Sequence, residues 1–330
     1  MNTTKLKVLC YSLGLLLLCT LWCCKTPAVL QTPVTKSVTE VAPKYSGTTE
    51  MMIPSVDTIK ISGTLEYAGR DKLMILVAGS GPTDRDCNSA DLNTNAFKMI
   101  ADTLVTMGYS SFRYDKRGIG ESTRVGEELM TLTDRVDDIN NIVEFFKSDF
   151  SEIIIFGHSE GALVGAIASE QSGVDGFVSA CGMSITMDKM ILEQLEKYPK
   201  ALPLAQEYIE KIKQGEDDFE INPALQSVFR PSLFKFYRVA MSLDPQVEIA
   251  KLTMPTLVVG GACDIQVAAS HAEALQQAQP TAQLLVIDNM GHVLKEISAD
   301  CSDVNNAYRD GGLPLNGEFV SGLRGFLDGI

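Results

Sequence analysis

A serine between two glycines is the first pattern in this sequence whose residue types suggest chemistry. The segment Gly157-His158-Ser159-Glu160-Gly161 follows the apolar run EIIIF and precedes ALVGAIAS. This order predicts a buried strand, a tight turn and a helix of small residues, with the Ser159 hydroxyl projecting at the end of the strand. A hydroxyl placed in this way is a nucleophile for acyl transfer, provided that a base takes its proton. The five-residue pattern alone is weak, and its placement makes it informative.

The base must come from one of only three histidines. His158 adjoins Ser159 on the turn and is expected to point away from it. His271 falls inside an expected helix, where a solvated or capping role is expected. His292, in IDNMGHVLK, comes just after the apolar run AQLLVID. We therefore expect His292 on a loop at the same edge of the sheet as Ser159, where it can act as the base.

The base needs a carboxylate that orients it. Asp264 follows the strand-like run TLVVGG, and it gives the chain order Ser159, Asp264, His292 that is known for one architecture with this type of turn. Asp288 is the alternative acid, because it lies close to His292 in the sequence. Side chains so near one another along the chain rarely have the required geometry.

Two backbone N–H groups must stabilise the oxyanion that forms during acyl transfer. The N–H of Glu160, directly after the serine, is the first candidate. The second is Ser80, in the loop Gly79-Ser80-Gly81-Pro82 that closes the apolar run KLMILVAG. Gly81 beside it is a candidate substrate contact. A plain glycine turn remains the alternative interpretation of this loop.

The elements that must position these residues alternate between strand-like and helix-like segments from residue 57 onward. This alternation predicts an α/β fold, with a mostly parallel central sheet and helices on both faces. The first segment, 57–67, is expected as an antiparallel edge strand. Further strands are expected at 72–79, 109–115, 152–157, 174–181, 256–262 and 282–288, and helices at 95–108, 132–148, 162–171, 271–279 and 317–329.

One segment interrupts the alternation. Residues 184 to about 247 contain amphipathic helical patterns and no convincing strand, which predicts an inserted helical lid. Its apolar residues Met187 and Ile191 recur at helical spacing, together with Met190 and Leu195. We expect Met187 and Ile191 to contact substrate, and internal packing of the lid is the alternative for each of them.

With these segments in order, residues 57–330 resemble an α/β-hydrolase. The matching motifs are VAGSGPTDRD, FRYDKRGIGES, GHSEG, GGACDIQV and GHVLK. More narrowly, the chain is similar to the bacterial branch of serine aminopeptidases and lysophospholipase-like esterases. Two positions depart from the pattern: Ala78 stands where many relatives have histidine, and Cys87 where glycine is usual.

This resemblance, together with the residues, implies a serine hydrolase that cleaves a small carboxylic ester. A hydrolase of amide bonds, of the aminopeptidase type, is the second hypothesis, and a non-catalytic binding protein of the same fold is the third. No cofactor and no metal are expected, because no cluster of His, Cys or Asp has the spacing of metal ligands.

Several charged residues near these motifs have two interpretations. Asp84 could line the mouth of the pocket, but the run Asp84-Arg85-Asp86 is more typical of a salt-bridge cluster that supports structure. The residues Asp115, Lys116 and Arg117, before a glycine turn, are interpreted as structural on the same grounds. The side chain of Glu160 would meet a substrate amine or pair with a nearby cation.

The N-terminal residues predict export. In residues 1–24, Lys5 and Lys7 precede an apolar run of the length found in signal peptides. A lipid anchor on Cys24, which would tether the protein to a membrane, simple cleavage and an uncleaved anchor remain open alternatives. Residues 25–56, rich in Thr, Pro and Val, are expected to form an extended linker. We therefore expect the protein in the periplasm or the cell envelope.

The net charge of the chain excludes one class of partner. The chain carries a formal net charge of −14, which argues against nucleic acid as a partner.

After the leader, four cysteines remain: Cys87, Cys181, Cys263 and Cys301. An oxidising compartment permits one or two disulfides among them, and the sequence does not determine the pairing. It does not determine the oligomeric state either.

Overall fold

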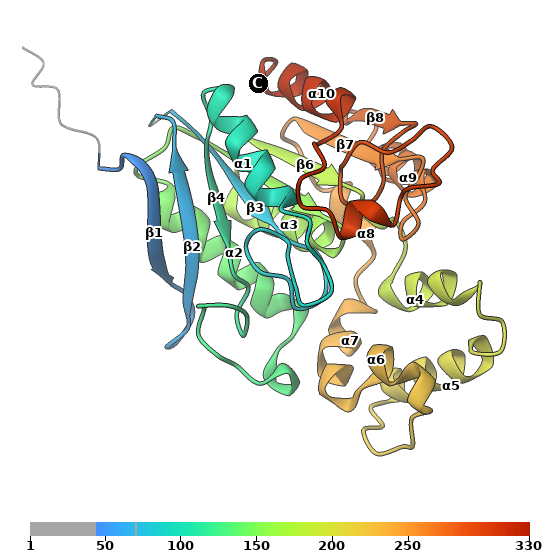
Figure 1. Ribbon diagram of the computed structural model, residues 1–330. Helices are drawn as coiled ribbons and strands as arrows, with labels where there is room; N and C mark the ends of the chain where they lie inside the picture. Colours follow the sequence, from blue (N-terminus) through green and yellow to red (C-terminus); the bar gives the residue numbers. More distant parts are fainter. Residues whose placement is uncertain (1–43, 70) are drawn as a thin grey trace, which may run out of the picture. The chain divides into compact units, whose positions relative to one another are not determined.

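An eight-stranded sheet forms the centre of the part of the chain that the computed structural model describes, residues 44–69 and 71–330 (Figure 1). The strand order is β1-β2-β4-β3-β5-β6-β7-β8. Strand β2 is antiparallel to both of its neighbours, and all pairs from β4 to β8 are parallel. The bounds are β1 Gly47–Pro54, β2 Lys60–Tyr67, β3 Lys72–Val77, β4 Ser110–Tyr114, β5 Glu152–His158, β6 Gly176–Ala180, β7 Thr256–Gly261 and β8 Gln283–Ile287.

The first strand corrects a boundary expected from the sequence. Residues 47–54 were assigned to the extended linker 25–56, but they pair along their whole length with β2, from Gly47 opposite Tyr67 to Pro54 opposite Lys60. Only one residue of β1, Ile53, is buried. An edge strand with so little buried surface has a weak hydrophobic pattern, so its sequence resembles that of a linker. The expected leader, 1–24, and residues 25–43 lie outside the described residues.

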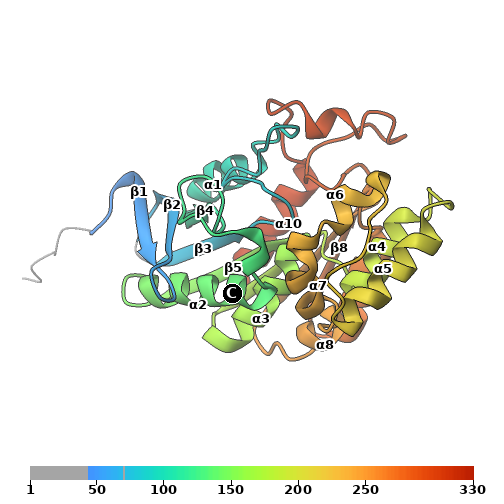
Figure 2. The same ribbon diagram turned by 90° about the horizontal axis from the view of Figure 1, so that it is seen from below.

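Alternate residues of the central strands pack into two separate cores, as the pleat of a sheet requires. On one face, Ile75 and Ile155 belong to a core that includes residues of α2, α3 and α9. On the other face, Leu76 and Phe156 pack with α1 and α10. Figure 2 shows α1 above the strands, with α2 and α3 below them. The bounds are α1 Ala96–Thr106, α2 Leu132–Phe146, α3 Glu160–Ser172, α9 Ala269–Ala278 and α10 Gly317–Leu327.

A helical insertion connects β6 to β7, and its helices α4 to α7 occupy the lower right of Figure 1. Its helices bury phenylalanines, among them Phe229 and Phe234, in the same core as α2 and α3. The insertion therefore shares its hydrophobic core with the helices that cover this face of the sheet. The bounds are α4 Met187–Leu195, α5 Leu202–Gln214, α6 Gln226–Phe229, α7 Phe234–Ala240 and α8 Pro245–Ile249, with short 3-10 helices at 223–225 and 231–233. Two further 3-10 helices lie at Glu127–Leu129 and Asn306–Tyr308.

A disulfide links the loop after β7 to the long segment after β8. Cys263 and Cys301, separated by 38 positions, form this bond with a Cα–Cα distance of 5.4 Å. Cys87 and Cys181 are free. In residues 44–69 and 71–330, no helix has both the length and the apolar character needed to cross a membrane.

Candidate active site

Ser159 occupies a strained turn between β5 and α3. Its φ of 58° and ψ of −125° lie outside the regions that a non-glycine residue normally adopts. Hydrogen bonds hold the turn on both sides, because the Ser159 N–H donates to Ala180 O at 2.9 Å and its carbonyl accepts from the Ala162 N–H at 2.9 Å. Such conformations cost about 1–3 kcal/mol and persist only where the surroundings impose them. The backbone therefore presents the Ser159 side chain at the end of the sheet, as the sequence predicted.

The glycines around the serine are required by close packing. A Cβ on Gly157 would collide with the backbone of Gly161, and a Cβ on Gly161 would collide with Val77 O. Gly79, in the loop after β3, lies against Ser159, since a Cβ there would be 2.8 Å from the Cβ of Ser159. Larger residues at these three positions would push the loop, the strand and the helix apart.

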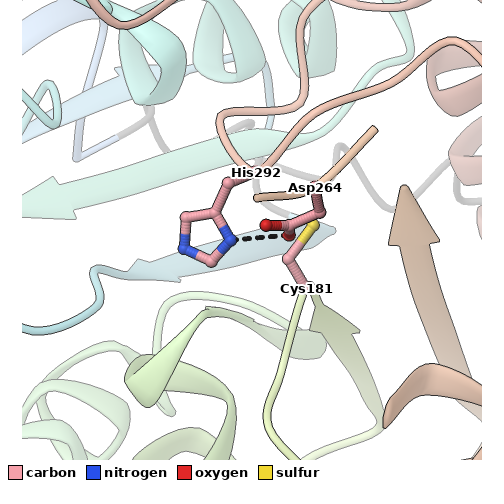
Figure 3. Close-up of side chains that lie close together, drawn as sticks. All are labelled: Cys181, Asp264 and His292. Atoms are coloured by element: carbon pink, nitrogen blue, oxygen red, sulfur yellow. Dashed lines mark hydrogen bonds and ion pairs between the residues drawn. The ribbon is translucent and has the colours of Figure 1, made fainter. Parts of the chain in front are cut away.

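The side chains of His292 and Asp264 point toward each other (Figure 3). The Nδ1 of His292 donates to Oδ2 of Asp264 at 2.7 Å. Both side chains are buried, with 4% of His292 and none of Asp264 exposed. His292 and Ser159 line the same cavity. Because Nδ1–H is bound to the carboxylate, Nε2 is the ring nitrogen left to accept a proton.

Two further contacts hold this pair. The Oδ1 of Asp264 accepts from the N–H groups of Gln266 at 2.8 Å and Val267 at 2.9 Å. Burial alone would raise the pKa of Asp264, but His292 and these two N–H groups hold the pKa below its ordinary value. Asp264 therefore stays ionised at neutral pH. The alternative acid, Asp288, is exposed.

His158 holds the backbone of His292. Its Nε2 lies 2.7 Å from His292 O, and because a carbonyl only accepts, Nε2 must carry the hydrogen. Burial, with the neighbouring His292, lowers the pKa of His158 to about 3. His158 is therefore neutral and acts as a hydrogen-bond donor.

Cys181 is a site residue that the sequence analysis did not identify. It follows β6 with a positive φ of 50°, and its Sγ lies within 4.8 Å of a carboxylate oxygen of Asp264 and a ring nitrogen of His292 (Figure 3). Burial and the Asp264 carboxylate raise the pKa of this thiol well above its usual value. These three residue types can bind a metal, but the Asp264–His292 hydrogen bond accounts for two of them. The residues are far apart in the sequence, so their spacing gave no signal.

A small cavity of about 90 Å³ lies over Ser159. Gly79, Ser80 and His292 form part of its wall, and the remainder is mainly apolar. Other lining residues are Thr83, Cys87, Leu92, Thr94, Ala96, Phe97, His158, Gln266, Val293, Leu294 and Tyr308. A serine hydroxyl and a histidine ring beside an apolar wall form a site that can accommodate an acyl or alkyl group next to a carbonyl.

The predicted oxyanion donors lie on the two segments that flank the nucleophile. Glu160 is the first residue of α3, so its N–H has no acceptor within the helix. Ser80 follows Gly79, which packs against Ser159. Ser80 also lines both this cavity and a second one. Both N–H groups stay predicted donors on this geometry.

The second cavity, of about 210 Å³, lies between the loop after β3 and the helical insertion. The core sheet side contributes Ser80, Gly81 and Glu160, and the insertion contributes Phe236 and Tyr237. The carboxylate of Glu160, only 4% exposed, pairs with Arg135. Pairing with a nearby cation was one of the two roles expected for this side chain.

Comparison with known proteins identifies the family of this chain. Residues 93–296 match the model of the serine aminopeptidase, S33 family. The chain belongs to this family. The esterase EstD of Thermotoga maritima is 28% identical over 237 residues, which cover 67% of this chain and 54% of EstD. The chain thus spans about half the length of the curated relative that it matches.

Solved structures show that the fold is that of α/β-hydrolases. An esterase of Pyrococcus furiosus superposes with a TM-score of 0.58 at 18% identity, covering 87% of this chain and 95% of that one. Est1E from Butyrivibrio proteoclasticus gives a TM-score of 0.56 at 18% identity, covering 86% and 98%. The predicted fold class, including the inserted helices, is confirmed.

Three residues expected at the substrate lie elsewhere in this family member. Met187 and Ile191 are buried in the core of the insertion and line neither of the two cavities. The apolar face of α4 therefore serves packing, which was the alternative interpretation. Asp84 accepts from the N–H groups of Asp86 and Asn88 and so holds a turn. Gly81 does line the second cavity.

The charged motif around Arg85 has the structural role that was favoured. Arg85 bonds Asp115 through Nη2 at 2.8 Å and also pairs with Glu50. These contacts support a structural role.

The position of His271 corrects an expectation from the sequence. It is buried rather than solvated, with Nδ1 2.8 Å from Ser184 Oγ and Nε2 2.9 Å from Glu193. It contacts neither Ser159 nor Asp264.

Proposed function

We propose that this protein is a serine hydrolase that cleaves small carboxylic esters through an acyl-enzyme. The observation that carries the proposal is the convergence of three groups from distant segments. Ser159 on its strained turn shares a cavity with His292, whose Nδ1 is bound to the buried Asp264. This constellation supports nucleophilic catalysis, whatever the fold that carries it.

The chemistry follows from the positions of these groups. Ser159 Oγ attacks the ester carbonyl while His292 Nε2 accepts the hydroxyl proton. Asp264 holds the ring in the tautomer with a proton on Nδ1 and stabilises the imidazolium. The negative charge on the former carbonyl oxygen is held by the N–H groups of Ser80 and Glu160. His292 then protonates the leaving alkoxide, and water, activated by the same base, releases the acid and restores Ser159.

The two cavities account for the two halves of an ester. The smaller one contains Ser159 and His292, and the larger one begins at Ser80 and extends to Phe236 of the insertion. A substrate carbonyl at Ser80 would place one half in each cavity. The helical insertion thus helps to select the substrate, while the triad sets the chemistry. An ester is favoured over an amide because two of the similar proteins are named esterases.

The test is labelling and turnover of the purified protein. A fluorophosphonate probe is expected to label the wild type at Ser159 and to leave Ser159→Ala unlabelled. The wild type should hydrolyse p-nitrophenyl acetate or butyrate, and Ser159→Ala should retain less than about a thousandth of that rate. Full turnover by Ser159→Ala would refute the proposal. Higher kcat/KM for aminoacyl p-nitroanilides than for the esters would favour the aminopeptidase alternative, and turnover of neither class would favour a binding protein.

We further propose that the protein works in an oxidising compartment outside the cytoplasm. The Cys263–Cys301 bond supports this, because disulfides are rare where thiols are kept reduced. Cell fractionation tests the location, and recovery of the protein only in the cytosolic fraction would refute it.

A further inference from the structure

A lysine that the sequence analysis classed as structural lies directly behind the loop of the predicted oxyanion donor. Lys116 follows β4 and is only 4% exposed. Its Nζ donates to Gly79 O at 2.6 Å, to Gly81 O at 2.7 Å and to Thr83 Oγ1 at 3.1 Å. An ammonium group has three donors. All three therefore bind one short loop, and none of these partners is a carboxylate.

These bonds orient the peptide that carries the Ser80 N–H. Gly79 O and the Ser80 N–H belong to the same peptide unit, and in a trans peptide they point in opposite directions. Since Lys116 holds the carbonyl on one side, the N–H is directed to the other side. Gly79 itself packs against Ser159. The lysine thereby fixes the rotation of this peptide next to the nucleophile.

The burial of this charge is costly. Burial lowers the pKa of Lys116 to about 7, and the like charge of Arg135, on α2, adds to the effect. Glu160, Asp84 and Cys87 act in the opposite direction. A methionine would fill a similar volume without the cost of desolvation. Stability of the loop alone does not explain why the position holds a charged donor.

We propose that Lys116 is a positioning residue for the oxyanion hole: it holds the Gly79–Ser80 peptide so that the Ser80 N–H faces the oxygen of the tetrahedral intermediate. The proposal rests on the proposed esterase function. Lys116 also lines the second cavity, but its Nζ is bound to the loop, so we assign it the positioning of this peptide and no bond to the substrate. Its effect is confined to the transition state, in which the charge on that oxygen develops.

The variant Lys116→Met tests this role. Removal of one oxyanion donor typically lowers kcat by about 10²–10³-fold. Because the donor is loosened and not deleted, we expect kcat for p-nitrophenyl butyrate to fall by about 10–100-fold. KM should change by less than about threefold, since the ground-state carbonyl makes little use of the donor. The affinity for a trifluoromethyl ketone, which forms a tetrahedral adduct with serine, should fall in parallel with kcat.

Lys295 provides a matched control. It is also a fully buried lysine, and it donates to the carbonyl oxygens of Asp310 at 3.3 Å and Leu313 at 2.7 Å. Unlike Lys116, which lines the second cavity, Lys295 lines neither cavity, so a change in KM confined to Lys116→Met would report on lost substrate contact. Lys295→Met should lower the melting temperature as Lys116→Met does, because both remove buried hydrogen bonds, but it should keep kcat within about threefold.

The outcomes separate the two proposals. Labelling and turnover by the wild type, followed by unchanged kcat in a folded Lys116→Met, would overturn the positioning role and leave the esterase function intact. An equal fall of kcat in Lys116→Met and Lys295→Met, or a change in KM alone, would also overturn the positioning role and leave the esterase function intact. Should Lys116→Met not fold, Lys116→Gln replaces it. Its amide keeps two donors, so a smaller loss in kcat at constant KM is expected, and no loss would overturn the proposal.

Discussion

The disulfide between Cys263 and Cys301 makes a quantitative prediction about stability. Replacing both residues by serine, or reducing the bond, releases a constraint on the unfolded chain across a separation of 38 residues. In the chain-entropy relation, ΔS is about −2.1 − 1.5R ln n cal/mol/K, which gives about 4 kcal/mol at 25 °C for this loop. The free energy of unfolding should fall by about that amount in the double variant.

The corresponding shift in melting temperature follows from the size of the folded unit. Its described part comprises residues 44–69 and 71–330, so an unfolding entropy of about 2.1 cal/mol/K per residue sums to about 0.6 kcal/mol/K. A loss of about 4 kcal/mol then lowers Tm by about 6 °C. Thermal unfolding followed by circular dichroism, with and without a phosphine reductant, measures this shift.

The double variant Cys263→Ser/Cys301→Ser controls for effects of the reductant other than cleavage of the disulfide. Reductant should lower the Tm of the wild type and leave that of the variant unchanged. Activity at 25 °C should change by less than about threefold, because Asp264 is held by the N–H groups of Gln266 and Val267 and not by the disulfide. A wild-type Tm that does not respond to reductant would refute the reasoning, as would a Tm of the variant equal to that of the wild type.

Two further predictions concern the charges at the site. Asp264→Asn should lower kcat by about 10⁴-fold, because an amide can donate to Nδ1 of His292 and so favours the wrong tautomer; ester hydrolysis measures this, and a loss below tenfold would remove Asp264 from the triad. For Lys116 the folded pKa, about 7, lies below the ordinary value of 10.5. Between these pH values the unfolded chain binds more protons than the folded one, so stability rises with pH. In urea unfolding, the wild type should therefore gain stability relative to Lys116→Met from pH 7 to 10, and a constant difference would contradict the lowered pKa.

The sequence predicted those parts of the site that depend on strand ends. Ser159, Asp264 and His292 each follow an apolar run, and parallel strands bring their carboxyl ends to one edge, so the sequence predicted that these residues lie close together. Their catalytic roles stay predictions. The fold class follows from the same alternation. Strand β1 was missed because only Ile53 of its residues is buried, which leaves too little hydrophobic pattern to detect.

Other features depend on three-dimensional contacts that spacing does not encode. Cys181, Asp264 and His292 converge from three different loops. The pairing of Cys263 with Cys301 depends on the path of the segment after β8. For α4, the helical periodicity correctly predicted an apolar face. It did not reveal that Met187 and Ile191 pack into the core and do not line the two cavities.

Stability and chemistry make opposite demands on the residues around Ser159. The positive φ of the serine and the buried charge of Lys116 each raise the free energy of the folded state. Both features concern neighbouring parts of the backbone. The conformation of Ser159 directs its hydroxyl out of the sheet, and Lys116 holds the peptide that carries the Ser80 N–H. The surrounding close packing of Gly157 and Gly161 and the hydrogen bonds of the turn offset these costs. A site that is arranged before substrate binds needs no reorganisation when charge develops, and that is the source of its advantage over water.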